Sequence, residues 1–351
     1  MQFPGQGTPP VGIIFDSAMG SRIDDALAMA LLYGLDGKNE ARVVSVSVSK
    51  SNIHSAAFSE VIGRFYAGAV SGAFGAFGRN LPVGMADNGK LAEDSPMLLV
   101  PLAKKNAEGQ IAYPHGIHTL VDTAEVPALL RNAFTSQADQ NCMVIVTGPA
   151  TNLAQVLDLP GVKDWITRKV RYLVIVAGNF AGGGPELNVK SDIAAAKKLF
   201  AQWPTQIIVA GSEVGQAIRF PAESIEVDFA YAKDHPVADA YRAYQQMPYD
   251  AETTAMAAVL SAIRPKEKYF KMSESGTVTI TPEGKTNFSA SAGGKHQYLI
   301  VDAAKKDEVV KAYRELASAK PVVRAPRLRQ QKKEEPAKPV TEAKPVTEPK
   351  P

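Results

Sequence analysis

Carboxylates gather near the start of the chain, in the stretch "VGIIFDSAMGSRIDDALAMALL" over residues 11–32. Asp16 ends an apolar run, and after seven non-acidic residues the adjacent pair Asp24 and Asp25 opens a helical pattern. Acids at a helix start can simply complement the helix dipole. Acids delivered to the end of a buried strand also suit a metal ion or a polar ligand. Three acids in this arrangement favour a site, although the centre of the loop carries Ala18 and Arg22.

Further along the chain, polar side chains again follow apolar runs. Such residues can be turn formers or helix N-caps, or they can face a ligand together. The Gly-rich loop within residues 173–196 lacks the spacing of a phosphate-binding loop, and its Asn and Glu residues suit sugar hydroxyls better. The candidate residues are Ser49, Ser51, Thr147, Asn179, Glu186, Asn188 and Asp250.

The elements that would position these residues alternate along the chain. Short runs such as "VGIIF", "CMVIV" and "RYLVIV" are apolar throughout, and helical patterns fall between or after them. Continuous apolar strands separated by helices predict an α/β fold with a mostly parallel, Rossmann-like sheet flanked by helices. The carboxyl ends of such strands meet at one edge of the sheet, where ligands bind.

The C-terminal part of the chain has a different character. Residues 275–291 alternate around a "PEGK" turn, which predicts an antiparallel β-hairpin, and residues 305–319 form an amphipathic helical pattern. The remaining residues are rich in Pro, Lys and Glu and repeat "KPVTE", a composition typical of disorder. We therefore expect a flexible N-terminus over residues 1–10, one domain over 11–318 and a disordered tail over 319–351.

Charge is distributed unevenly over the sequence. From Lys320 onward nine basic residues face four acidic ones, which leaves 30 basic and 32 acidic residues for the rest of a chain whose net charge is +3. A body close to neutrality argues against a nucleic-acid-binding fold. The single cysteine, Cys142, excludes an intrachain disulfide framework and lies in an apolar run typical of a core.

The sequence contains no apolar run of the length that a membrane helix needs. Its first residues, "MQFPGQGTPP", are unlike a signal peptide. We expect a cytoplasmic protein if this sequence is complete, and a secreted or periplasmic one if a leader was removed.

Four segments in this order resemble the inosine–uridine-preferring nucleoside hydrolase family, over about residues 11–318. The first, "DSAMGSRIDDALAMALL", is similar to the DTDMGxDxDDALAxALL motif of one subgroup, and "TGPATNLA", "AGNF…ELNVKSDIAAA" and "YDAETTAMAAVLSAIRP" follow at the expected places. The resemblance implies the nucleoside hydrolase fold and assembly into dimers or tetramers. It also implies hydrolysis of the N-glycosidic bond of ribonucleosides through an oxocarbenium-like transition state.

In this family a calcium ion at the strand ends holds the nucleophilic water and the ribose hydroxyls. The resemblance implies three calcium ligands in this chain: Asp25, the Thr147 carbonyl and Asp250. Asp16 would lie behind them. It implies four ribose-binding side chains: Asp24, Asn179, Glu186 and Asn188.

The sequence departs from the family pattern where the chemistry takes place. Ala18 stands at the position of the Asp that ligates calcium and takes the proton from water, and Arg22 replaces a further loop acid. Tyr249 stands where some members have a leaving-group His. The family's "NKDN" is "SKSN" here, so that Asn and Asp become Ser49 and Ser51. We therefore expect no intact catalytic residue.

These changes weaken both the metal site and the catalysis. Calcium takes six to eight oxygen ligands, and an inward Arg22 about 4 Å away would repel each unit charge by roughly 4 kcal/mol at an effective dielectric near 20. Loss of a general base costs on the order of 10²–10⁴ in rate. His115 and His118 could line the pocket from a loop, but neither has a motif that replaces the base.

Three hypotheses remain open. The chain is a nucleoside hydrolase with weakened chemistry, in which water replaces the lost calcium ligand. Alternatively, it binds a ribosyl compound or a partner without catalysis, and Arg22 pairs with Asp24 or Asp25 in place of the calcium charge. A third possibility is that the guanidinium accepts an anionic ligand such as a phosphorylated sugar.

Overall fold

A ten-stranded sheet forms the centre of the fold in the computed structural model, which describes residues 10–67 and 81–322. Its strand order is β11-β10-β12-β6-β5-β4-β1-β2-β3, with β9 also paired to β12, and the neighbours from β12 through β3 are parallel. The strands of this sheet are β1 (Val11–Ser17), β2 (Ala41–Val48), β3 (Val83–Met85), β4 (Cys142–Val146), β5 (Val170–Val176), β6 (Gln206–Ala210), β9 (Phe270–Met272), β10 (Gly276–Ile280), β11 (Thr286–Ala290) and β12 (His296–Val301).

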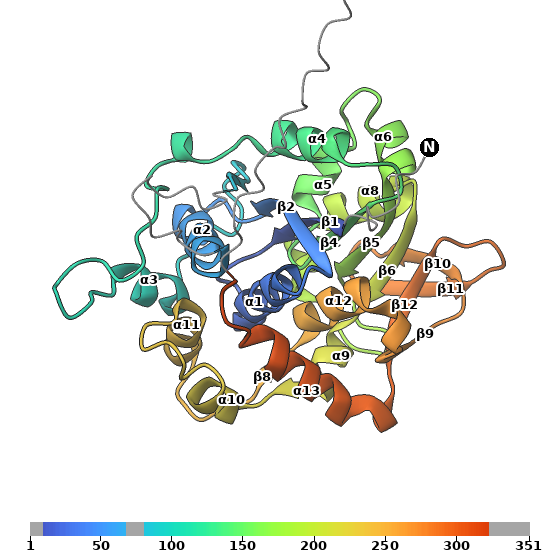
Figure 1. Cartoon of the computed structure of the whole chain (residues 1–351). Coiled ribbons are helices and arrows are strands. Elements are labelled where there is room, and N and C mark those ends of the chain that lie inside the picture. The colour runs from blue at the N-terminus through green and yellow to red at the C-terminus, as the bar shows by residue number, and fades with distance from the viewer. Residues whose placement is uncertain (1–9, 68–80, 323–351) are drawn as a thin grey trace, which may run out of the picture.

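Helices cover both faces of the sheet (Figure 1). On one face lie α4 (Val126–Ser136), α5 (Thr151–Val156), α6 (Val162–Lys169) and α8 (Ile193–Gln202). On the other lie α1 (Ile23–Gly37), α2 (Ile53–Ala67), α12 (Thr254–Ile263) and α13 (Lys306–Ala317). The remaining helices are α3 (Pro96–Ala103), α7 (Leu187–Ser191), α9 (Ser212–Ala217), α10 (Ala222–Val227) and α11 (Pro236–Tyr244). A separate short pair is formed by β7 (Arg219–Phe220) and β8 (Ala251–Glu252).

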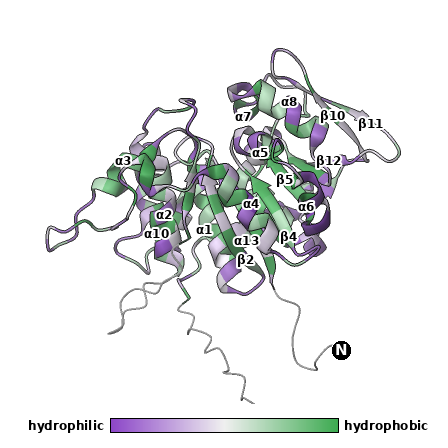
Figure 2. Cartoon of the chain, turned by 90° about the horizontal axis from the view of Figure 1, so that it is seen from above, coloured by the Kyte–Doolittle hydropathy of each residue, from purple (hydrophilic) through white to green (hydrophobic). Residues whose placement is uncertain are grey.

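The alternation of side chains along each strand divides the core in two. In β1, Phe15 packs into the core beneath α1 and α12, whereas Ile14 packs into the core beneath α4 and α5. Hydrophobic residues are concentrated in central strands such as β4 and β5, and hydrophilic residues lie in loops, at the sheet edge and on outer helices (Figure 2). A sheet buried on both faces explains why its strands read as continuous apolar runs.

The connections place a crevice at the carboxyl end of β1. The chain runs outward from β1 through β2 to β3, and then returns to add β4 on the other side of β1. Such a switch point is where open α/β sheets bind ligands. The candidate site is therefore expected where β1, β4 and β5 end and α1 and α7 begin.

The structure confirms the α/β fold and the mostly parallel sheet that the sequence predicts. The hairpin of β10 and β11 and the closing helix α13 are confirmed as well. The expected flexible N-terminus and disordered tail fall almost wholly on residues 1–9 and 323–351, which lie outside the described residues. In the described part of the chain, none of the helices combines the length and apolar character needed to span a membrane.

Candidate functional site

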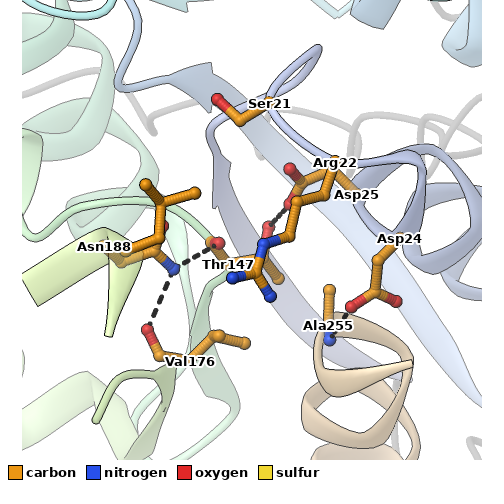
Figure 3. Close-up of a pocket in the computed structure, with 9 residues that line it drawn as sticks. Ser21, Arg22, Asp24, Asp25, Thr147, Val176, Asn188 and Ala255 are labelled. Carbon is orange, nitrogen blue, oxygen red and sulfur yellow. Dashed lines mark hydrogen bonds between the residues drawn. The ribbon is translucent and has the colours of Figure 1, made fainter. Parts of the chain in front are cut away.

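A small pocket opens where β1, β4 and β5 end (Figure 3). Its volume is about 10 Å³, which is room for about one water molecule. A ribose ring is several times larger, so this pocket must open before it can hold a sugar. The lining residues are Ser21, Arg22, Asp24, Asp25, Thr147, Val176, Leu187, Asn188 and Ala255.

Asp25 lies in the first turn of α1 and is held from the end of β4. Its Oδ1 accepts a hydrogen bond of 2.6 Å from the Thr147 hydroxyl. Burial raises the pKa of Asp25 to about 7, although the Thr147 hydrogen bond and the charges of Arg22 and Lys50 oppose the rise. The site can therefore contain a protonated or a charged carboxyl near neutral pH.

Asp24, its neighbour, caps another helix. Its carboxylate accepts hydrogen bonds from the backbone N–H groups of Ala255 at 2.6 Å and Met256 at 3.2 Å, at the N-terminus of α12. Burial raises the pKa of Asp24 to about 8. Asp24 lines the pocket and also joins α1 to α12; ribose binding by this residue stays a prediction.

Glu186 and Asn188 come from the Gly-rich loop and α7. Asn188 Nδ2 donates to the carbonyls of Thr147, at 2.8 Å, and Val176, at 3.1 Å, so it bridges the ends of β4 and β5. Glu186 is buried and accepts from the N–H groups of Asn188 and Val189 as the N-cap of α7. Burial raises the pKa of Glu186, and the charge of Arg22 opposes this.

Arg22 projects from the loop after β1 into the pocket, where Figure 3 shows its guanidinium between Thr147 and Ala255. Its salt-bridge partner is Glu252, at 3.5 Å between Nη1 and Oε2. This corrects the expectation that Arg22 pairs with Asp24 or Asp25, since no such ion pair occurs among the described residues. The guanidinium still acts over a longer range, because its charge lowers the pKa of both aspartates.

Ala18 is fully enclosed just beyond the end of β1. Its carbonyl accepts from the N–H of Ser21, and a Cβ atom placed on Gly148 would lie only 2.6 Å from its backbone nitrogen. The Ser49 hydroxyl donates to the Ser17 carbonyl at 3.1 Å, and the Ser51 N–H donates to the Lys90 carbonyl. Ala18 thus contributes a buried methyl group, and the hydrogen bonds of the two serines tie neighbouring loops together.

Asp16 does not line the pocket and is enclosed at the end of β1. It is fully buried and accepts from the Ser47 hydroxyl at 2.5 Å and from Asn152 Nδ2 at 2.6 Å. Burial raises its pKa to about 7 against those two hydrogen bonds. Asn152, in the first turn of α5, therefore holds Asp16, and Asp192 caps α8.

Several predicted site residues do not line the pocket, among them Asn179, Glu186, Tyr249 and Asp250. Asp250 is exposed, and its Oδ1 accepts from the N–H of Ala222 at the start of α10. The Tyr249 hydroxyl donates to the Tyr241 carbonyl at 2.6 Å, so it is engaged within its own segment. Asn179 binds its own loop, with Oδ1 accepting from the N–H groups of 181 and 183. None of the chain's histidines lines the pocket either.

The structure adds two charged residues that sequence reasoning missed. Lys50 is only 3% exposed, donates to the Glu93 carbonyl at 3.1 Å, and lowers the pKa of Asp25 by its charge. Glu252 is the carboxylate that meets Arg22. Lys50 lies inside "SKSN" and Glu252 inside "YDAETTAMAAVLSAIRP", but the resemblance implies no role for either residue.

The donor set does not fit calcium. A calcium site needs six to eight oxygen atoms, several of them anionic. Of the expected ligands only Asp25 and Thr147 converge, the Thr147 carbonyl already accepts from Asn188, and a guanidinium shares the space. Residues 10–67 and 81–322 contain no group of three or more His, Cys, Asp or Glu side chains arranged to hold a metal.

Comparison with known proteins identifies the family. The sequence model of the inosine-uridine preferring nucleoside hydrolases matches residues 13–322. The chain belongs to this family. No curated protein matches this chain in sequence.

Solved structures show the same fold. A plant nucleoside hydrolase shares 20% sequence identity with this family member, at a TM-score of 0.63 over 89% of this chain and 100% of that one. An inosine-uridine preferring nucleoside hydrolase from Bacillus anthracis shares 15% identity, at a TM-score of 0.65 over 88% and 99%. A purine-preferring ribonucleoside hydrolase from Gardnerella vaginalis shares 16% identity, at a TM-score of 0.62 over 88% and 99%.

Proposed function

We propose that this chain is a calcium-independent member of the nucleoside hydrolase family, which binds the ribosyl part of a nucleoside or related compound without cleaving the N-glycosidic bond. The observation that carries the proposal is the Arg22 guanidinium inside the pocket, beside Asp25 and Thr147. A resident guanidinium supplies positive charge among buried carboxyls. A divalent cation would have to overcome its repulsion.

The retained polar groups suit the hydroxyls of a sugar. Asp24 lines the pocket and accepts two backbone hydrogen bonds, and a carboxyl group has further lone pairs, so it keeps capacity to accept from a ligand. Asp25 can accept or donate, because its pKa lies near 7. Fixed acceptors on several elements favour a ligand with adjacent hydroxyls, which is what ribose presents.

The same pocket lacks the groups that hydrolysis needs. Ala18 offers no carboxylate to take a proton from water, and the Tyr249 hydroxyl is engaged by a carbonyl and cannot donate to a leaving base from there. General acid–base assistance contributes on the order of 10²–10⁴ in rate for each group. The N-glycosidic bond of a bound nucleoside is therefore expected to remain intact.

Calorimetry and a hydrolysis assay test the proposal on the full chain. We expect ribose, inosine or uridine to bind equally well with calcium and with chelator, and no free base to be released. Ribose 5-phosphate in the same series tests the anionic alternative. Calcium-dependent release of hypoxanthine or uracil would overturn the proposal, and so would the absence of any ribosyl binding.

Restoring the carboxylates provides a matched comparison. Ala18→Asp with Arg22→Asp adds two anionic oxygen donors, and we expect this variant to gain calcium binding. Ala18→Asn with Arg22→Asn adds side chains of nearly the same size without charge, and we expect it to gain none. If both variants bound calcium alike, charge would not be what the natural pocket lacks.

A further inference from the structure

Glu252 stands at the mouth of the pocket between two arginines. Its Oε2 lies 3.5 Å from Arg22 Nη1, and its Oε1 lies 3.7 Å from Arg219 Nη2. The side chains of Arg22 and Glu252 are 29% and 34% exposed, whereas Asp24 and Asp25 deeper in the pocket are each 3% exposed. The ion pair therefore sits where the pocket meets solvent.

The β7–β8 pair fixes the orientation of Glu252. Arg219 and Glu252 are directly opposite each other in this antiparallel pair, so their side chains share one face. Arg219 is anchored in turn, since its Nη1 donates to the Asp250 carbonyl at 3.2 Å. With one carboxylate oxygen directed at Arg219, the other remains available for Arg22.

We propose that Arg22 closes the pocket and that Glu252 is the positioning residue that holds it there. Among the described residues, Glu252 is the acid within salt-bridge distance of the Arg22 guanidinium. The volume left beside that guanidinium is about 10 Å³, so Arg22 occupies space that a sugar ring would need. A partly exposed ion pair contributes little to stability, so a ligand can displace it.

This inference deepens the proposed function but depends on it only for the identity of the ligand. Arg22 must move away from the pocket before a ligand can bind. The apparent affinity is therefore proportional to the fraction of molecules in that open state. Weakening the contact between Glu252 and Arg22 raises that fraction.

A cysteine placed in the pocket measures closure without any ligand. Val176 lines the pocket and is buried, and Val176→Cys is a small change that introduces a thiol there. The native Cys142 gives little background, because it is buried and its thiol pKa is raised to about 12. The rate of alkylation by uncharged iodoacetamide then reports opening, and Ala255→Cys provides a second reporter if the first variant folds poorly.

We expect Glu252→Gln to raise the labelling rate about threefold, because losing one exposed ion pair shifts the closed–open equilibrium by about that factor. Arg22→Ala should raise it at least about tenfold, since no opening step then precedes labelling. Removing the Arg22 charge would by itself raise the pKa of the new thiol and slow its alkylation. A faster alkylation rate in Arg22→Ala therefore shows that the pocket has become more accessible. Arg242→Ala, which breaks ion pairs with Glu226 and Asp239 away from the pocket, is the matched control and should leave the rate unchanged.

The decisive comparison is Glu252→Gln in the Arg22→Ala background. If Glu252 acts by positioning Arg22, the second substitution adds nothing there. A threefold rise that persists without Arg22, or a labelling rate that Arg22→Ala leaves unchanged, overturns the inference. A chain that closes in this way but binds no ribosyl compound would contradict the proposed function alone.

Discussion

At the scale of single residues, the proposed loss of calcium binding rests mainly on two side chains. Ala18 removes an anionic oxygen, and Arg22 adds a cation. Both changes are visible in the sequence, because they fall inside a motif that is otherwise retained except for Ser17 in place of Thr. Lys50 has a comparable electrostatic effect on Asp25, but its burial arises from tertiary packing and no local pattern announces it.

Another single residue, His235, should make stability depend on pH. It is 1% exposed, and its Nε2 lies 3.2 Å and 3.1 Å from the hydroxyls of Tyr66 and Tyr231. Burial lowers the pKa of His235 to about 3, below the 6.5 of an unfolded histidine. Its neutral form therefore favours folding above pH 6.5, and this contribution is lost as the pH falls through about 3.

We expect the contribution of His235 to lower the free energy of unfolding by about 3–5 kcal/mol as the pH falls from 6.5 to 3, measured by urea unfolding. Buried Asp16, Asp24 and Asp25 have raised pKa values and act in the opposite direction, so the informative quantity is wild type minus His235→Gln. That difference should shrink as the pH falls. A difference that stays constant with pH would contradict the burial argument.

At the scale of elements, Asp24 is the joint between α1 and α12. The first N–H groups of a helix have no partner within it, and here two of them donate to a carboxylate 231 and 232 residues away in sequence. Asp24→Ala leaves both buried donors unsatisfied, and we expect it to lower the free energy of unfolding by about 2–4 kcal/mol.

Asp24→Asn keeps one acceptor oxygen and should lose about half as much, on the order of 1–2 kcal/mol. Urea unfolding at one pH compares the two variants. Asp307→Ala, which removes an exposed acid from the first turn of α13, serves as control and should stay within about 0.5 kcal/mol of wild type. If Asp24→Ala lowered the free energy of unfolding as little as Asp307→Ala does, Asp24 would not support α12.

The elements were predictable wherever hydrophobic periodicity carries the information. The ends of β1, β4 and β5 follow from apolar runs, and residues placed there, such as Asp25 and Thr147, meet as expected. Asp250 shows where this reasoning stops. The two-residue strands β7 and β8 pair across more than thirty residues, which short-range pattern cannot reveal, and Asp250 then caps α10 while Glu252 faces Arg22.

At the scale of the whole molecule, the fold depends on pattern more than on particular residues. The nucleoside hydrolase structures share only 15–20% identity with this chain, yet they match at TM-scores of 0.62–0.65 over most of its length. Many different apolar side chains can fill a parallel sheet buried on both faces. The chemistry has no such tolerance, because a few charges around one crevice determine which ligands it can hold.

The boundary of the folded unit gives the last prediction. Helix α13 buries Val309, Tyr313 and Leu316 against α1, and each such side chain contributes roughly 1.5–3 kcal/mol. A chain that ends before residue 306 loses all three and should not fold stably.

Removing only residues 323–351 should leave the melting temperature of the protein unchanged, because the sequence of this part is poor in residues that build a core. This shorter truncation removes eight basic and four acidic residues, so the formal net charge changes from +3 to −1. Thermal unfolding and ion-exchange retention at pH 7 test both consequences, and a clear fall in melting temperature after the shorter truncation would show that the tail packs on the domain.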